Sequence, residues 1–397
     1  MKFRTYTMED ALEQIIDYRG KTPKKSDSGI PTLSAKSVKN NHIDYSLCYY
    51  ISPDEYDRFM VRGFPKVGDV LLTTEAPMGM VARLDRDDVG IAQRLLTLRG
   101  KQDILDNEYL LYFLQSSIGQ SLLKARETGT TVTGIKQAEF RKIQIDIPEI
   151  HIQKKIGGIL RILDQKIEIN NKINENLEQQ IEMLLLNTIN NADTQPVKLG
   201  DYLYIKGRIG WKGLKKSEYL PFSDYRIING ESLTLSGIDW NKAGYISAER
   251  YEESPEIKLN IGDILLSKDG TIGKIGYVDK LETPTSVASG IFVIRNTRQA
   301  EISTQFIYYL LKSRLFKAFI TSRTEGSVIP HLYQKDFMKF EFQLPSPVDM
   351  KIFDDTTAAM FSMVFSNLNE NERLIHLRDS LLPKLMSGEL DISNLDL

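Results

Sequence analysis

The stretch from residue 150 to residue 190 restricts the fold more than any other part of the chain. It contains no proline, and apolar residues recur along it at a spacing of seven. Such a repeat places one stripe along one side of an α-helix, the pattern of a helix packed lengthwise on another helix. At 1.5 Å per residue, about forty residues form a rod of roughly 60 Å. The sequence therefore predicts a long helix with a helical partner.

An internal repeat identifies that partner. Residues 68–72 (GDVLL) return as residues 262–266 (GDILL), and residues 108–116 (EYLLYFLQS) return as residues 305–313 (QFIYYLLKS). A repeat period near 200 residues indicates a duplicated unit of one domain followed by one helix. The residues expected to pair the two helices are Ile156, Leu163, Asn170, Leu177 and Leu184 in the first and Phe353, Met360, Asn367, Leu374 and Leu381 in the second. The helices should run antiparallel, and we expect Asn170 and Asn367 to meet where they cross.

The sequence thus predicts an α+β protein of two pseudo-repeat α/β domains, separated and joined by two long antiparallel coiled-coil helices. The predicted boundaries are residues 1–148 for the first domain, 149–192 for the central helix, 193–345 for the second domain and 346–397 for the C-terminal helix and tail. Further expected elements are a short amphipathic helix at residues 8–16, strands near residues 30–33, 69–73, 94–98 and 143–147, a helix at residues 109–124, and their copies in the second domain, among them a helix at residues 306–320. Ser346 and Pro347 should begin the second long helix. Pro383 should kink it or end its regular part.

Composition narrows the class of protein. The chain has 397 residues, a net charge of −2 and one cysteine, Cys48. One cysteine excludes an intramolecular disulfide and any multi-cysteine zinc site, and it suits a reducing cytoplasm. Neither a signal peptide nor an apolar run long enough to cross a membrane is expected. We therefore expect a cytoplasmic protein.

No catalytic centre is expected. Residues 270–274 (GTIGK) resemble a phosphate-binding loop, but the two glycines lack the four intervening residues, and Ile275 stands where a serine or threonine should hold magnesium. A tight turn is the better interpretation. The four histidines are scattered without metal-ligand spacing, so no metal site is predicted.

Basic loops are the positive signal. Residues 206–216 contain several lysines and arginines with one aromatic residue, Trp211, between them. A similar basic cluster follows Tyr18 in the first domain. Such loops can bind phosphates and lie against bases. The predicted DNA-binding residues are Arg19, Lys21, Lys24, Lys25, Lys36, Thr130, Thr131, Thr133, Lys206, Arg208, Trp211, Lys212, Lys215, Lys216 and Lys268. Within this set, the lysines are expected to contact phosphates, whereas Trp211 and the three threonines are candidates for base reading.

Several motifs together resemble the specificity subunit of a type I restriction–modification enzyme. They are residues 15–23 (IIDYRGKTP), residues 68–71 with their second copy, residues 153–156 (QKKI), residues 163–164 (LD) and residues 377–390 (LRDSLLPKLMSGEL). The resemblance covers essentially the whole chain. The second domain has no copy of residues 18–23.

The resemblance implies a non-catalytic subunit whose two target-recognition domains each read one half of a split double-stranded DNA site. The paired helices would act as a spacer and dock two methyltransferase subunits. S-adenosylmethionine, ATP and magnesium would then belong to the methyltransferase and to a restriction subunit that moves and cuts DNA. The alternatives are the specificity partner of a fused nuclease–methylase, an autonomous nuclease or methylase, and a structural coiled-coil adaptor.

Overall fold

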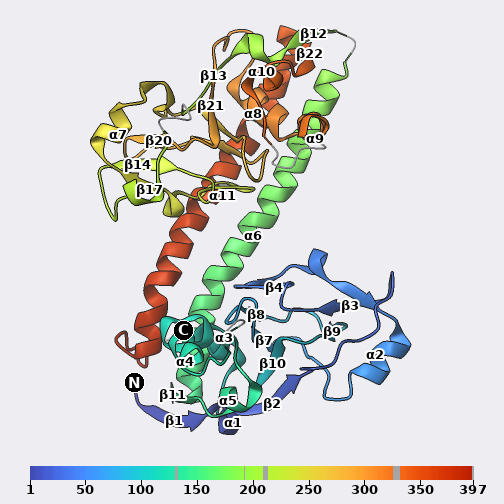
Figure 1. Ribbon diagram of the computed structural model, residues 1–397, viewed down its shortest axis with the longest axis vertical. Coiled ribbons are helices and arrows are strands. Elements are labelled where there is room, and N and C mark those ends of the chain that lie inside the picture. Colours follow the sequence, from blue (N-terminus) through green and yellow to red (C-terminus); the bar gives the residue numbers. More distant parts are fainter. Residues whose placement is uncertain (130–132, 192, 209–212, 325–330, 396–397) are drawn as a thin grey trace. The chain divides into compact units, whose positions relative to one another are not determined.

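The computed structural model describes residues 1–129, 133–191, 193–208, 213–324 and 331–395. The chain forms two compact units, one made of Met1–Ile169 with Glu370–Leu397 and the other of Asn170–Asn369. Each unit contains one α/β domain together with part of two long helices, α6 (Ile150–Ile189) and α11 (Pro347–Ser387) (Figure 1). The predicted α+β class, with two domains and two long helices, is confirmed.

The first domain is built on a four-stranded antiparallel sheet in the order β2–β10–β7–β8. Its strands are β2 (Leu12–Asp17), β10 (Leu95–Gly100), β7 (Val70–Thr73) and β8 (Val81–Arg83). A three-stranded sheet contains β6 (Tyr49–Ile51), β3 (Ile30–Leu33) and β9 (Gly90–Ile91), and two strand pairs are β1 (Phe3–Thr7) with β11 (Gln144–Pro148) and β4 (Val38–Lys39) with β5 (His42–Ile43). The helices are α1 (Met8–Ala11), α2 (Pro53–Phe59), α3 (Asn107–Gln115), α4 (Ser117–Ala125) and α5 (Gln137–Arg141).

The second domain repeats this plan strand for strand. Its four-stranded sheet has the order β13 (Leu203–Gly207), β21 (Ile291–Asn296), β18 (Ile264–Ser267) and β19 (Ile275–Tyr277). Its three-stranded sheet contains β17 (Gly244–Ile246), β14 (Tyr225–Ile228) and β20 (Thr285–Val287), and its strand pairs are β12 (Thr194–Lys198) with β22 (Glu341–Pro345) and β15 (Leu233–Thr234) with β16 (Gly237–Ile238). The helices are α7 (Ala248–Glu252), α8 (Thr304–Lys312), α9 (Arg314–Thr324) and α10 (Gln334–Phe337).

The repeated glycine–aspartate motif has a structural role in both sheets. The Asp69 carboxylate accepts two hydrogen bonds from Arg99, at 2.8 and 2.7 Å, and Asp263 accepts two from Arg295, at 2.7 and 2.9 Å. Both carboxylates are buried. A two-pronged arginine–carboxylate pair fixes geometry as well as charge, so the motif ties the start of β7 or β18 to the neighbouring strand.

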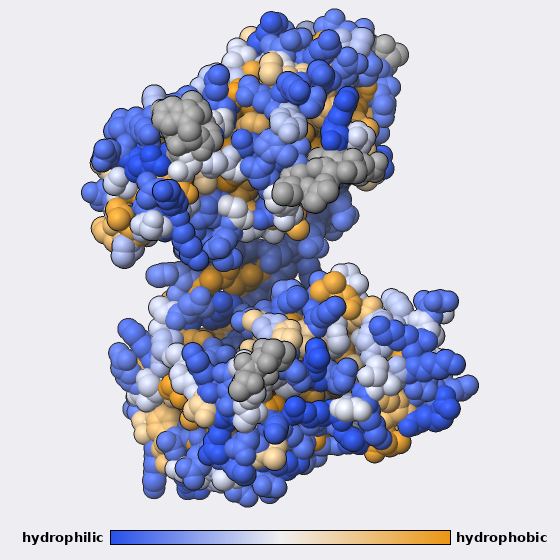
Figure 2. Space-filling view, in the orientation of Figure 1, coloured by the Kyte–Doolittle hydropathy of each residue, from blue (hydrophilic) through white to orange (hydrophobic). Residues whose placement is uncertain are grey.

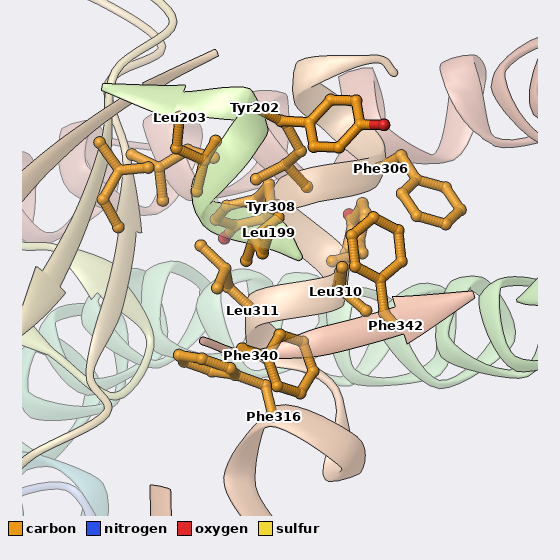
Figure 3. Close-up of a cluster of buried hydrophobic side chains, with 14 of the residues drawn as sticks. Leu199, Tyr202, Leu203, Phe306, Tyr308, Leu310, Leu311, Phe316, Phe340 and Phe342 are labelled. Atoms are coloured by element: carbon orange, nitrogen blue, oxygen red, sulfur yellow. The ribbon is translucent and has the colours of Figure 1, made fainter. Parts of the chain in front are cut away.

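Each domain packs helices against its sheet around an apolar core. In the second domain, Figure 3 shows Phe306 and Leu310 of α8 close to Phe342 of β22, with Phe316 and Phe340 nearby. All five side chains are buried. Large aromatic side chains remove much apolar area from water, so this core stabilises the domain.

The helix predicted at residues 8–16 is wrong beyond Ala11. Residues 12–17 form β2, which pairs with β10 from Leu12 opposite Gly100 to Asp17 opposite Leu96. The two consecutive isoleucines Ile15 and Ile16 favour a strand, and pairing with β10 buries Ile16.

The single helices predicted at residues 109–124 and 306–320 are each two helices. Ser116 separates α3 from α4, and its hydroxyl accepts a hydrogen bond from the Gly119 N–H at 3.2 Å. Ser313 separates α8 from α9, and its hydroxyl accepts from the Phe316 N–H at 3.4 Å. A serine N-cap begins a new helix, so the chain turns at the same place in both copies.

The regular part of α11 does not end at Pro383, because the helix continues through it to Ser387; a kink at Pro383 stays a prediction. Proline inside a helix removes one hydrogen bond and costs about 3 kcal/mol. Leu385 and Met386, just beyond it, are buried in the core of the first domain. Burying two such side chains contributes about 1.5–3 kcal/mol each, enough to offset the proline.

Candidate nucleic-acid interface

One end of each four-stranded sheet gathers the loops that carry the basic residues. In the first domain, the register places Asp17 at the end of β2 opposite Leu96, and Thr73 at the end of β7 opposite Leu95. Leu72 lies opposite Val81 at the start of β8. The segment after β2, the segment after β7 and the segments before β10 and β8 therefore all emerge at the same end of the strands. We call this end of the sheet, and its counterpart in the second domain, the loop end.

Backbone hydrogen bonds join three segments of the loop end in the first domain. The Thr74 N–H donates to the Arg94 carbonyl at 3.0 Å, and the Thr74 carbonyl accepts from the Ile135 N–H at 2.9 Å. Glu75 forms an antiparallel bridge with Gly134. We call this meeting point the loop junction. It brings Thr133, which is exposed, close to the turn between β7 and β8.

The second domain builds the same junction from different residues. The Lys268 N–H donates to the Gly290 carbonyl at 2.9 Å, and the Lys268 carbonyl accepts from the Leu332 N–H at 3.0 Å. Asp269 forms the antiparallel bridge with His331. The backbone frame is thus held in common, whereas the side chains on it differ.

The turns beside the junctions exclude a phosphate-binding loop at residues 270–274. These residues connect two antiparallel strands, β18 and β19, rather than a strand and a helix. Ser267 caps the turn by accepting from the Lys274 N–H at 2.8 Å, as Thr73 accepts from the Met80 N–H at 2.9 Å. Gly273 has a φ of 88°, a conformation that favours glycine. The prediction of a tight turn is confirmed.

The structure spreads the predicted basic residues of the first domain over two places. Arg19 and Lys21 are exposed in the segment that follows β2 at the loop end. Lys36 is exposed just after β3, whose last residue, Leu33, accepts a hydrogen bond from the Ala92 N–H of the segment before β10 at 2.8 Å. Lys24 and Lys25 are also exposed but lie beside α2 and β6: the Lys24 N–H donates to Glu55 at 2.9 Å, and the Lys25 ammonium lies 4.7 Å from the Tyr49 ring centre.

Tyr18 does not supply the aromatic surface that the sequence suggested. It is fully buried, and its hydroxyl donates to the Gly63 carbonyl at 3.1 Å and accepts from the Arg62 N–H at 2.9 Å. Burial raises the pKa of this phenol. Its ring stacks on Phe59 at 4.7 Å, so Tyr18 anchors the loop instead of facing DNA.

Arg208 is likewise an internal residue, and its assignment as a DNA contact is wrong. Only 2% of it is exposed, and its guanidinium donates to the Val287 carbonyl at 3.2 Å and to the Ser286 hydroxyl at 3.4 Å. Burial lowers the pKa of Arg208, and the charge of Arg250 acts in the same direction. Arg208 and Tyr18 each directly follow the first strand of the four-stranded sheet, where the fold requires a buried side chain.

The remaining candidates of the second domain are accessible where the structure describes them. Lys206, Lys215 and Lys216 are exposed, and Lys268 is half-buried with its ammonium 5.0 Å from the Phe292 ring centre. Four other predicted residues lie outside the described residues: Thr130, Thr131, Trp211 and Lys212.

Four polar residues at the junctions were not among the predicted site residues. The Arg94 side chain is 50% exposed, its backbone has a φ of 70°, and its guanidinium lies 3.8 Å from the Glu75 carboxylate. In the second domain, His331 pairs with Asp269 through its Nδ1 atom. Aligning the ends of the repeated strands, rather than the densest runs of lysine, would have pointed to these positions.

The residues chosen for helix pairing all face away from open solvent. Ile156, Asn170 and Phe353 are buried, and the others are half-buried: Leu163, Leu177, Leu184, Met360, Asn367, Leu374 and Leu381. The Asn367 amide donates to the Asn174 side chain at 2.8 Å, and the Asn174 amide donates to the Val364 carbonyl at 3.2 Å. Asn367 therefore contacts Asn174, which lies one helical turn after Asn170 in α6. The predicted partner of Asn367 was Asn170. Direct contact with Asn170 stays a prediction.

A buried polar network joins the long helices to the first domain. Asp164 of α6 accepts from the Tyr112 hydroxyl of α3 at 2.7 Å and from Arg378 of α11 at 2.7 Å. Burial, with the nearby Asp164 charge, raises the pKa of Tyr112, which keeps the phenol as a donor. Asp164 and Arg378 belong to two separate sequence motifs, so the structure explains why both motifs carry a charge.

Within the described parts of the chain, no cluster of three or more histidine, cysteine or acidic side chains could hold a metal ion. The helices in those parts include none that is long and apolar enough to cross a membrane. Figure 2 shows a mainly hydrophilic face with small separated apolar patches.

Comparisons of the sequence and of the fold with known proteins all lead to one protein family. The family described as "Type I restriction modification DNA specificity domain" matches residues 8–179 and again residues 191–372. The chain is 23% identical to the MjaVIII specificity subunit of a type I restriction enzyme from Methanocaldococcus jannaschii, over 77% of this chain and 75% of that protein. It is 24% identical to the MjaIX specificity subunit of the same organism, over 84% of this chain and 80% of that protein. The solved S subunit of a type I restriction–modification system from M. genitalium has a similar fold, with a TM-score of 0.58 and 19% identity over 97% of this chain and 96% of that one.

Proposed function

The chain belongs to the type I restriction–modification DNA specificity family, and from this premise we propose that it is a non-catalytic subunit in which each domain reads one half of a bipartite DNA target. The observation that carries this proposal is the loop junction, which is built twice on one backbone frame with different exposed side chains. Two copies of one frame suit two similar tasks. Different side chains on it suit two different half-site sequences.

The loop ends are the proposed DNA-binding surfaces. Exposed basic residues near them, such as Arg19 and Lys36, can contact phosphates and hold each domain in register on the duplex. Phosphate contacts supply affinity but carry little sequence information. Sequence must be read by side chains that reach base edges in a groove.

The helices α6 and α11 are proposed to act as a spacer between the domains and as the docking platform for two methyltransferase subunits. Support comes from exposed apolar residues along one side of α11. Val348, Ile352 and Met363 are 69%, 57% and 51% exposed, and their spacing places them, with Ala359, on one face of the helix. An apolar face that a domain does not bury is typical of a protein–protein contact.

The chemistry is proposed to reside on partner subunits. S-adenosylmethionine would bind the methyltransferase, and ATP and magnesium would serve the subunit that translocates and cuts DNA. This chain would contribute only the choice of site. Its DNA substrate implies that it acts in the cytoplasm.

Methyl transfer measured with separate and mixed components tests the proposal. We expect no transfer from S-adenosylmethionine to DNA by this chain alone, and sequence-specific adenine methylation when it is mixed with its methyltransferase. Transfer by this chain alone would show an autonomous methylase. Methylation with the same base preference whether or not this chain is present would show an adaptor without a role in recognition.

A further inference from the structure

Each loop junction holds one carboxylate between two flanking positions. In the first domain, Glu75 lies between Arg94, whose guanidinium is 3.8 Å away, and Gly134, which forms the antiparallel bridge with it. A Cβ atom added to Gly134 would stand 2.9 Å from the Glu75 Cβ and 2.6 Å from the Thr74 carbonyl oxygen. A side chain there would displace the junction, so the basic group comes from the Arg94 side.

The second domain uses the same arrangement with its sides exchanged. Asp269 lies between Gly290 and His331, and His331 now carries the group that pairs with the carboxylate. A Cβ atom added to Gly290 would stand 3.6 Å from the Asp269 Oδ2 atom, an ordinary van der Waals distance, so the carboxylate lies directly beside this glycine. Arg94 and Gly290 hold equivalent places, and so do Gly134 and His331.

A carboxylate is out of place on a surface that binds DNA through phosphates. It repels them, and each such charge lowers the affinity for every sequence alike. A carboxylate at that position can accept a hydrogen bond from the amino group of cytosine or adenine. It can also hold an arginine or histidine side chain in one orientation. Both roles concern base identity.

The backbone of Arg94 supports the same conclusion. Its φ of 70° is a conformation that costs a non-glycine residue about 1–2 kcal/mol. The strained residue carries a half-exposed guanidinium, the group that recognises guanine by two parallel hydrogen bonds. Backbone strain held at an exposed arginine, in a junction fixed by hydrogen bonds on both sides, is typical of a binding position.

We propose that Glu75 with Arg94 in the first domain, and Asp269 with His331 in the second, are the pairs that read bases in the two half-sites. The inference rests on the proposed function of the loop ends. The exchange of glycine and basic residue means that the two domains present the basic group from opposite sides of the carboxylate. The two half-sites should therefore differ in sequence at the positions that these pairs contact.

The test uses the full chain with its methyltransferase on a library of DNA duplexes randomised at every position, with the methylated sequences read out. Arg94→Ala, Arg94→Lys and Glu75→Gln are compared with the natural chain. Arg86→Ala is the matched control, because Arg86 is also an exposed arginine paired with a neighbouring carboxylate, Asp88, but lies at the opposite end of the sheet. His331→Ala and Asp269→Asn are compared with Arg298→Ala, whose pair with Glu301 follows the far end of β21.

We expect Arg94→Ala to reduce discrimination at one or two positions of one half-site by about 5- to 150-fold and to leave the other half-site unchanged. Arg94→Lys should lose the same discrimination, because lysine lacks the two-pronged donor. His331→Ala should relax only the other half-site, and the control variants should keep both. A uniform loss over all sequences, or rescue by Arg94→Lys, would mean a phosphate contact and would overturn the inference. Unchanged base preference in these variants would also overturn it, whereas a natural complex without any base preference would overturn the proposed function itself.

Discussion

Replacing Arg378 by isoleucine is expected to destabilise the first unit by about 3 kcal/mol, because the buried Asp164 carboxylate then loses its cation. The Arg378 and Asp164 side chains are 15% and 7% exposed, and 2.7 Å separates their closest atoms. Removing one partner of a buried ion pair costs about 3–5 kcal/mol. We take the lower value, since Asp164 keeps its hydrogen bond from Tyr112.

The second unit contains the apolar version of the same site. Adding 197 to Tyr112 and Asp164 gives Tyr309 and Phe361, whose ring centres are 6.0 Å apart, and subtracting 197 from Arg378 gives Ile181, which is fully buried. An ion pair thus occupies these positions in the first unit, and apolar side chains occupy them in the second. Replacing a buried ion pair by apolar residues of similar total volume is often neutral or stabilising.

The double variant Asp164→Phe with Arg378→Ile is therefore expected to recover most of the loss seen in either single variant. The assay is urea unfolding of the full chain, with hydrogen exchange of peptides from α3 and β10 reporting on the first unit. Peptides from α8 and β21 report on the second unit and serve as the internal control. A double variant as unstable as the sum of the two singles would refute the coupling. Single variants that lose less than about 1 kcal/mol would show that the pair acts like an ordinary surface ion pair.

Three further predictions concern DNA binding, the spacer and the last helix. Lys215→Ala with Lys216→Ala should weaken binding equally for cognate and random DNA and lower the slope of log affinity against log salt by about one per lysine, as measured by titration at several salt concentrations; a loss confined to the cognate site would assign base reading to these lysines. Four residues inserted after Leu177 lengthen α6 by about 6 Å, close to two base pairs, so methylation mapping should show both half-sites unchanged with a spacer longer by one or two base pairs. An unchanged spacer would mean that the helices do not measure distance. Pro383→Ala should raise the unfolding free energy of the first unit by about 1–2 kcal/mol, because it restores a helical hydrogen bond; a loss of stability in the same urea assay would contradict this.

The features repeated over long stretches were predictable from the sequence. The seven-residue spacing gave α6 and α11, and the serine–proline pair gave the start of α11, where the Ser346 hydroxyl accepts from the Asp349 N–H at 3.2 Å. Local signals were weaker where tertiary pairing decides. The apolar residues at positions 12, 15 and 16 have a spacing that a helix would also show, and pairing with β10 makes this segment a strand.

The candidate site was predictable only in part, for a physical reason. Counting lysines and arginines finds charge, but it does not separate exposed residues such as Lys216 from Arg208, which the fold buries. The loop junction joins residues about 20 and 60 positions apart through strand register, so Glu75, Arg94 and Gly134 do not stand out in any short window.

The most direct test of recognition by two domains is the set of DNA positions at which a base change abolishes methylation by this chain with its methyltransferase. Recognition by two domains predicts two clusters of sensitive positions, separated by positions at which any base is accepted, with cluster centres about one helical turn, roughly 10 base pairs, apart. One contiguous cluster, or methylation that tolerates every single change, would contradict it.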